Sequence, residues 1–282
     1  MASLIVNADD FGLTQGVNRA IVELHAAGIL TSTTLMARAQ ASDEAIELAR
    51  ANPGLGVGCH IVIIDGEPVL PASAIPTLVE KKTGQFPAAI GTFVRRLLAR
   101  RIRASEIEAE TRAQIEFLQG KGLRLTHIDT HKHSHMFPSA LRPILRAARA
   151  CGIRAVRNPF EPAWAVRVAN QAPWLRAAQV SGLRCLGPVC RRIIAEEGFT
   201  TTDGTIAVAG TGVFDADMVR SLLQQMPEGT WELVTHPGYN DAHLLRIRTR
   251  LRASREIERL ALRTIREFPA VRLMSFAQLP RS

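Results

Sequence analysis

The stretch LIVNADDFGLTQGVNRAIVELHAAG, from Leu4 to Gly28, shows the pattern of one strand followed by one amphipathic helix. Leu4 to Ala8 form a short apolar run that ends in two acids. Thr14 precedes the helical periodicity and is a residue type that caps helix N-termini, and Gly28 lies where such a helix would stop. The stretch therefore predicts a βα unit with carboxylates at the carboxyl end of its strand.

The same alternation continues along the chain. Ser105 and Glu108 form a capping-box pattern at the start of one helix-like segment. Beyond the first strand, the chain has strand-like segments at residues 31–37, 56–63, 124–129, 153–158, 231–238 and 271–276. Helix-like segments follow at residues 42–54, 93–101, 105–122, 139–151 and 242–267. Strands that alternate with helices of about 10–15 residues indicate parallel βα units.

These segments favour an α/β fold built as a single (β/α) barrel, TIM-like but distorted, with seven or eight strands. No G-x-G-x-x-G follows the first strand, which argues against a dinucleotide-binding fold. We expect residues 1–282 to form one barrel domain, since a chain of this length can bury one large core. The least regular part, residues 159–202, contains Trp164 and Trp174 and is expected to be a lid or a substrate-side insertion.

No apolar run approaches the ~18 residues that span a bilayer, and the N-terminus lacks the features of a signal peptide. The protein is therefore expected in the cytoplasm. The four cysteines form no C-x-x-C pair, so they predict neither a zinc knuckle nor a disulfide framework.

The formal net charge is +9, which raises the question of an anionic partner. Basic residues are spread among acids, and the chain has one Tyr and no RNA-binding aromatic cluster, so we expect no nucleic-acid partner. Two readings stay open. The charge favours peripheral association with the inner face of a membrane, or it is a cationic surface with no dedicated partner.

Titratable side chains gather at the predicted carboxyl ends of four strands. They are Asp9, Asp10, His60, Asp129, His131 and His236. In a βα barrel these ends form one face, where active sites lie, so the residues are expected to converge in one pocket. Each residue could also have a purely structural role. The pair of acids could stabilise a turn or cap a helix, and a single histidine could simply be hydrogen-bonded.

The stretch THIDTHKHSHMFP, residues 126–138, contains four of the eight histidines. If it is a strand, histidines two residues apart face the same way, which burial explains poorly. Together with the strand-end acids, the cluster predicts a divalent metal site. One carboxylate and two imidazoles leave positions open for water and substrate, as a catalytic metal requires. A further carboxylate and a separate histidine could then accept and donate protons in amide or ester hydrolysis.

IVNADDFGLTQGVNRAI, TSTTLM, GVGCHIVI, THIDTHKHSHMFP and THPGY resemble, in order, the motifs of the YdjC/ChbG carbohydrate deacetylase family. The resemblance extends from the first strand to the His-Pro-Gly turn and covers most of the chain. It implies a βα barrel, one bound divalent metal, removal of acetyl groups from N-acetylated amino sugars, and often a homodimer.

The resemblance also implies residue roles. Asp10, His60 and His131 match the metal ligands, whereas Asp9 matches the general base and His236 the general acid. In this mechanism Asp9 takes a proton from the attacking water, and His236 protonates the departing amine. The metal could be Mg²⁺ or Zn²⁺, since both accept mixed oxygen and nitrogen ligands.

Three further residues of the cluster have less definite roles. His133 and His135 are expected to line the sugar pocket or to orient the ligands from behind. Asp129 is expected to orient a histidine. No role in the reaction itself is assigned to these side chains.

Residues 58–86 resemble the hopanoid-biosynthesis (HpnK-like) branch of the family, which implies an N-acetylglucosaminyl hopanoid lipid as substrate. The predicted helix 242–267, rich in Arg and Leu, would suit a membrane surface or simply the outside of a barrel. Three other functions stay open: a diacetylchitobiose deacetylase, a metal-dependent phosphoesterase on a similar barrel, and a non-catalytic sugar- or lipid-binding protein.

Overall fold

The computed structural model describes residues 2–169, 174–247 and 249–280. Its strands are β1 (Ala2–Phe11), β2 (Ser32–Leu35), β3 (Gly56–Ile61), β4 (Ile128–Thr130), β5 (Gly204–Ile206), β6 (Gly229–Thr235) and β7 (Arg272–Leu273). Its α-helices are α1 (Gln15–Ala26), α2 (Ser42–Ala51), α3 (Ile90–Leu98), α4 (Ala104–Gly120), α5 (Pro138–Ala150), α6 (Ala163–Val168), α7 (Trp174–Leu183), α8 (Gly187–Glu196), α9 (Ala216–Gln224) and α10 (Ser254–Ala261). Short 3₁₀ segments are η1 (His131–Met136), η2 (Arg184–Leu186), η3 (Leu244–Arg246), η4 (Leu262–Glu267) and η5 (Phe276–Gln278).

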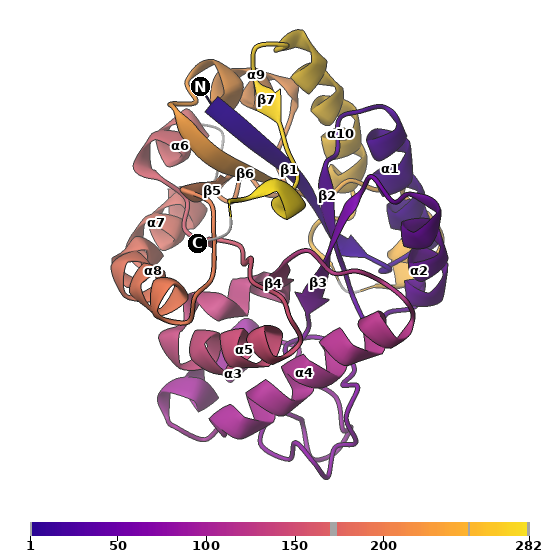
Figure 1. Cartoon of the computed structure of the whole chain (residues 1–282), viewed down its shortest axis with the longest axis vertical. Helices are drawn as coiled ribbons and strands as arrows, with labels where there is room; N and C mark the ends of the chain where they lie inside the picture. The colour runs from indigo at the N-terminus through magenta and orange to yellow at the C-terminus, as the bar shows by residue number, and fades with distance from the viewer. Residues whose placement is uncertain (1, 170–173, 248, 281–282) are drawn as a thin grey trace.

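The strands form one parallel sheet in the order β4-β3-β2-β1-β6-β5, and β7 pairs with the start of β1. Figure 1 shows the strands in the middle of the molecule with the helices around them. The expected α/β fold is therefore confirmed as a parallel half-barrel of six consecutive neighbouring strands, with β7 as a short additional strand beside β1. The expected TIM-like, distorted barrel with seven or eight strands is not confirmed as a full barrel.

The strand predicted after α5 is reduced to isolated parallel bridges, which join Ile128 to Val156 and Ala155 to Thr200. Backbone hydrogen bonds still pair this segment on both sides, from the Arg157 N–H to the Ile128 carbonyl oxygen at 3.1 Å and from the Val156 N–H to the Thr200 carbonyl oxygen at 3.0 Å, and side chains add to them. The hydroxyl of Thr201, for example, donates to the carbonyl oxygen of Val156 at 2.7 Å. The segment is therefore paired at both edges, but over too few residues to form a regular strand.

The long helix predicted over residues 242–267 is wrong. The described residues of this range contain η3, α10 and η4, and residue 248 lies outside them. Ile247 has extended backbone angles, and the Thr249 hydroxyl accepts a hydrogen bond from the Leu251 N–H at 3.1 Å. β-Branched residues are weak helix formers, so the Leu and Arg periodicity does not hold the helix through this point.

The predicted capping box of Ser105 and Glu108 is also wrong. The N-cap of α4 is Arg103, and no side chain caps the helix there. The start of α4 is set instead by a contact with a distant loop, since Glu106 accepts hydrogen bonds from the N–H and hydroxyl of Thr77, each at 2.7 Å. A tertiary contact has overridden the local signal.

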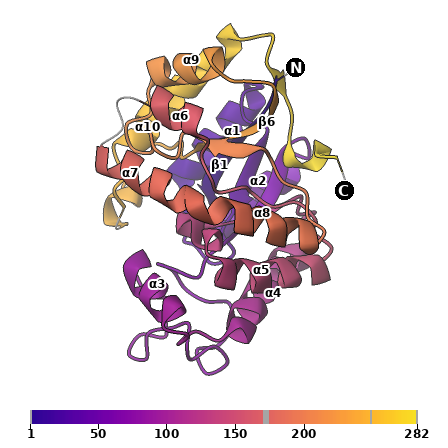
Figure 2. The ribbon, with the colours of Figure 1, turned by 90° about the vertical axis from the view of Figure 1, so that its left-hand side faces the viewer.

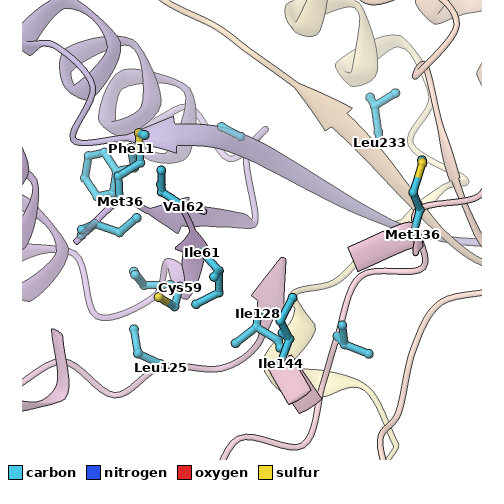
Figure 3. Close-up of a cluster of buried hydrophobic side chains, with 14 of the residues drawn as sticks. Phe11, Met36, Cys59, Ile61, Val62, Leu125, Ile128, Met136, Ile144 and Leu233 are labelled. Carbon is cyan, nitrogen blue, oxygen red and sulfur yellow. The ribbon is translucent and has the colours of Figure 1, made fainter. Parts of the chain in front are cut away.

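A continuous apolar core fills the space between the sheet and its helices. Phe11, Ile61, Ile128, Ile144 and Leu233 are buried in it, as Figure 3 shows for part of the cluster. Helix α5 packs between α4 and α8 (Figure 2). The core holds the carboxyl ends of β1, β3, β4 and β6 in fixed positions, and the candidate site lies at those ends.

Candidate active site

The two acids near the end of β1 have different partners because the strand is irregular there. The register between β1 and β2 shifts between Ala8 and Phe11, and Asp10 has a left-handed φ of 65°. A bulge of this kind re-aims a side chain, and sparsely populated backbone conformations tend to cluster at functional sites. Asp9 consequently contacts a buried arginine, whereas Asp10 turns toward two imidazoles.

Asp10, His60 and His131 form a compact group of three donor atoms. Asp10 Oδ1 lies 3.4 Å from His60 Nε2 and 3.3 Å from His131 Nδ1, and the two nitrogens are 3.2 Å apart. Donors bound at about 2.0–2.1 Å to a tetrahedral ion lie roughly 3.3 Å from each other, so the spacing fits one divalent metal. Within the described residues, Asp10 Oδ1 is also buried without a hydrogen-bond partner, as expected of an atom that serves a cation.

The second nitrogen of His60 faces away from this group. His60 Nδ1 lies 2.8 Å from Asp129 Oδ1 and 3.1 Å from the hydroxyl of Thr34. A carboxylate at Nδ1 fixes the tautomer that leaves Nε2 free as a ligand. Burial alone lowers the pKa of His60, but Asp129 and Asp10 outweigh it and raise that pKa to about 10. The same negative potential favours a divalent cation among the three side chains.

A second group of potential ligands, Asp9, His60 and Asp129, is equally compact. It fits a metal less well, because both oxygens of Asp9 and one of Asp129 are bound by Arg157. A guanidinium already supplies the positive charge that these carboxylates need. The group that contains Asp10 is therefore the better candidate for a single metal position.

Arg157 is completely buried and binds three carboxylates. Its Nη1 and Nη2 atoms donate to the two oxygens of Asp9 at 2.8 and 2.6 Å, and Nη1 lies 2.5 Å from Asp129 Oδ2. Its Nε donates to Glu232 Oε1 at 2.8 Å. Burial alone raises the pKa of Asp9, but the Arg157 guanidinium outweighs it and holds that pKa well below its usual range. Asp9 is therefore ionised and held in one orientation.

Replacing Arg157 by methionine is expected to lower the free energy of unfolding by about 3–5 kcal/mol at neutral pH, because three carboxylates lose their shared buried cation. Urea denaturation followed by circular dichroism measures this. Arg154→Met is the matched control, since Arg154 is exposed, and its effect should stay within about 0.5 kcal/mol. Equal stability of the Arg157 variant and the wild type would contradict the role of Arg157 as counter-ion.

His236 directly follows β6, so it reaches the same end of the sheet as Asp9. Its Nε2 atom lies 3.8 Å from Asp9 Oδ2, and its side chain is 12% exposed. Burial alone lowers the pKa of His236, but Glu258 and Asp9 outweigh it, so that this pKa is raised. An ionised carboxylate beside an imidazole that retains its proton is an arrangement suited to general base and acid chemistry.

The histidine cluster is not a strand, so the expectation that its histidines share one strand face is wrong. β4 ends at Thr130, and His131–Met136 form a 3₁₀ segment in which Lys132 and His133 have φ values of 56° and 51°. The Thr130 hydroxyl holds the turn, since it accepts from the His135 N–H at 3.1 Å and bonds the His135 Nδ1 atom at 2.7 Å.

His133 and His135 differ in position. His135 is buried and its Nε2 atom contacts the carbonyl oxygen of Arg157 at 3.2 Å. The Nδ1 atom of His133 is buried without a hydrogen-bond partner among the described residues. The expected roles of both histidines beside the sugar or the ligands stay predictions. Burial lowers the pKa of His135 to about 3 and that of His133 well below its usual value, so both are neutral at pH 7.

Four charged residues of the site were not predicted from the sequence: Arg157, Glu232, Arg255 and Glu258. Arg157 lies one residue before the end of the strand predicted over 153–158, and this position was the only signal for it in the sequence. Arg255 and Glu258 lie on α10, where the residue pattern suggested an ordinary basic helix. Arg255 forms a buried ion pair with Asp10 Oδ2, which leaves Oδ1 as the oxygen that faces the imidazoles.

Comparisons with known proteins cover nearly the whole chain. A family model described as YdjC-like protein matches residues 3–270. A carbohydrate deacetylase from Brevibacillus brevis is 33% identical over 242 residues, 86% of this chain and 84% of that protein. Another from Thermoanaerobacter pseudethanolicus is 29% identical over 93% of this chain and 91% of that protein. A crystal structure from Enterococcus faecalis, named for a proposed role in cellobiose-phosphate cleavage, matches with a TM-score of 0.75 at 25% identity, over 98% of both chains.

Proposed function

The chain belongs to the YdjC-like protein family, and we propose on this premise that it is a metal-dependent deacetylase acting on an N-acetylglucosamine unit. The observation that carries the proposal is the position of the Asp9–His236 pair beside the group of Asp10, His60 and His131. A protein that only binds a sugar needs neither a proton acceptor nor a proton donor next to metal ligands. A phosphoesterase with two metals is less well supported, because Arg157 engages the remaining carboxylates.

Asp10, His60 and His131 would hold the metal, which when bound polarises the acetamide carbonyl and makes a water more acidic. Asp9, kept ionised by Arg157, takes a proton from the attacking water. His236 donates a proton from Nε2 to the nitrogen that leaves, and the products are acetate and a free amino sugar.

We further propose that the acetylated sugar is carried on a hopanoid lipid and that the protein works at the inner face of a membrane. The resemblance of residues 58–86 to the hopanoid branch supports this, as does the net charge of +9. The homodimer and the choice between Mg²⁺ and Zn²⁺ stay predictions from the resemblance. In the described residues, no helix is long and apolar enough to cross a membrane.

Helix α7 is the part of residues 159–202 that we propose as the lid. It has no buried residue among those described, and Trp174 and Leu175 at its start are 75% and 57% exposed. Helix α6 is fixed instead, since Trp164 packs edge-on against Trp231 of β6 at 5.3 Å between ring centroids. Residues 170–173, between the two helices, lie outside the described residues.

Acetate release from N-acetylglucosaminyl hopanoid polyol and from N,N′-diacetylchitobiose, each with and without chelator, tests the proposal. We expect chelator-sensitive release from the hopanoid substrate and little from chitobiose. Release from chitobiose alone would assign the protein to the chitooligosaccharide branch. If metal-containing protein released no acetate from either substrate, the deacetylase proposal would be contradicted.

A paired variant separates the lipid contribution from the chemistry. Trp174→Ser with Leu175→Ser removes the exposed apolar side chains of α7 without touching the candidate metal ligands. We expect turnover of the hopanoid substrate to fall, and turnover of a short acetylated sugar to stay unchanged. Equal loss on both substrates would contradict a lipid-facing lid.

A further inference from the structure

Helix α10 is fixed to the turn that carries the candidate acid. The N–H of Gly238, at the end of the His-Pro-Gly turn, donates to the carbonyl oxygen of Arg255 at 3.1 Å. A Cβ atom at Gly238 would lie 3.2 Å from Arg255 Cδ and 3.2 Å from Val17 Cγ2, so the approach is already tight. The first turns of α10 therefore set the position of His236.

Glu258 lies directly behind the imidazole of His236. It is 1% exposed, and its Oε2 atom accepts from the backbone N–H of His236 at 2.7 Å. The same oxygen lies 3.8 Å from His236 Nδ1, whereas the opposite ring nitrogen, Nε2, faces Asp9. The other oxygen, Oε1, is buried and has no hydrogen-bond partner in the part of the chain that the structure describes, so it is free to accept a proton-bearing nitrogen.

We infer that Glu258 is a positioning residue for His236. It keeps the imidazole in the tautomer with a proton on Nδ1 and orients that N–H toward its own carboxylate. The other nitrogen, Nε2, then points toward Asp9 and the substrate. This rests on the proposed function of His236 as the acid. An imidazole carries one N–H when neutral, and a buried carboxylate beside one nitrogen determines which nitrogen keeps it. The proton given to the leaving nitrogen then comes from Nε2.

The charges around His236 agree with this role. Glu258 faces Nδ1, Asp9 faces Nε2, and Asp10 lies further into the site. The nearby cations Arg157 and Arg255 are paired with Asp9 and Asp10, respectively. Burial opposes the charged imidazole, yet the carboxylates raise the pKa of His236. A raised pKa keeps His236 protonated to higher pH, so the acid form is lost only as the pH rises through that pKa.

The variant Glu258→Gln tests the inference. Its amide oxygen still accepts from the His236 N–H, but the negative charge at Nδ1 is gone. We expect the alkaline limb of the kcat/KM profile to move to lower pH and kcat above that limb to fall about 10–100-fold, with KM and metal content nearly unchanged. Glu256→Gln is the matched control on the same helix, since the Glu256 side chain is 44% exposed, and it should leave the profile unchanged.

Nitrogen-15 NMR of the imidazoles gives a reading that does not depend on activity. In wild-type protein loaded with Zn²⁺ or Mg²⁺, neutral His236 is expected as the Nδ1–H tautomer, and Glu258→Gln should lower its pKa. An Nε2–H tautomer in the wild type would overturn the inference even if the variant does not fold. If the wild-type protein shows the expected tautomer but no deacetylase activity in any assay, the result would contradict the proposed function and leave the role of Glu258 as a positioning residue intact.

Discussion

Replacing His131 by alanine is expected to remove the bound divalent metal and the deacetylase activity together. His131 supplies one of three donor atoms, and its Nδ1 atom lies within 3.3 Å of both Asp10 Oδ1 and His60 Nε2. Two donors alone do not make a catalytic site of the usual three-ligand kind. Turnover should fall roughly 10²–10³-fold or more, since stabilisation of the developing oxyanion typically contributes about 10²–10³-fold.

Metal content after dialysis, measured by inductively coupled plasma mass spectrometry, and acetate release are the two readouts. His243→Ala is the control, because His243 contacts Gln40 on the surface and belongs to neither ligand group. We expect that variant to keep both metal and activity. Full metal occupancy in His131→Ala protein would show that the ligand assignment is wrong.

Replacing Asp9 by asparagine is expected to separate chemistry from metal binding. Asparagine has nearly the same shape as aspartate and can still accept a hydrogen bond from Arg157, but it cannot take a proton from water. The variant should keep the metal, because Asp9 lies outside the group of Asp10, His60 and His131. Turnover should fall about 10²–10⁴-fold, the usual contribution of a general base.

Metal content, kcat and thermal unfolding should be measured on the same Asp9→Asn preparation, since Arg157 loses one charged partner. Folded, metal-loaded protein with little turnover is the expected result. Near-normal turnover would remove Asp9 from the role of base. Loss of the metal would instead move Asp9 into the ligand set, as the alternative group with His60 and Asp129 would require.

Local signals in the sequence predicted the elements that depend on local physics. Helix α1 begins after Thr14, whose hydroxyl accepts a hydrogen bond from the Val17 N–H as an N-cap does. The parallel sheet was predictable because strands alternate with helices, and the convergence of Asp9, Asp10 and His236 followed from the carboxyl ends of parallel strands. The roles of these residues stay predictions.

The lengths of the elements were less predictable. Residues 124–129 were expected to be a strand, yet β4 contains only Ile128–Thr130 and η1 follows. The turn depends on hydrogen bonds of the Thr130 side chain, which a pattern of alternating residue types does not contain. The prediction of one helix over 242–267 was wrong for a related reason. A hydrophobic pattern does not show where the hydrogen bonds of the helix backbone are interrupted.

By itself, therefore, the sequence determined the βα order, the strand-end acids and histidines, and the family. Only the tertiary structure decided the electrostatic surroundings of those residues. Arg157 is 148 positions from Asp9 and Arg255 is 245 positions from Asp10, and both are buried in ion pairs. The partner of a buried charge is set by which surfaces the folded core brings together, and periodicity along the chain carries no information about it.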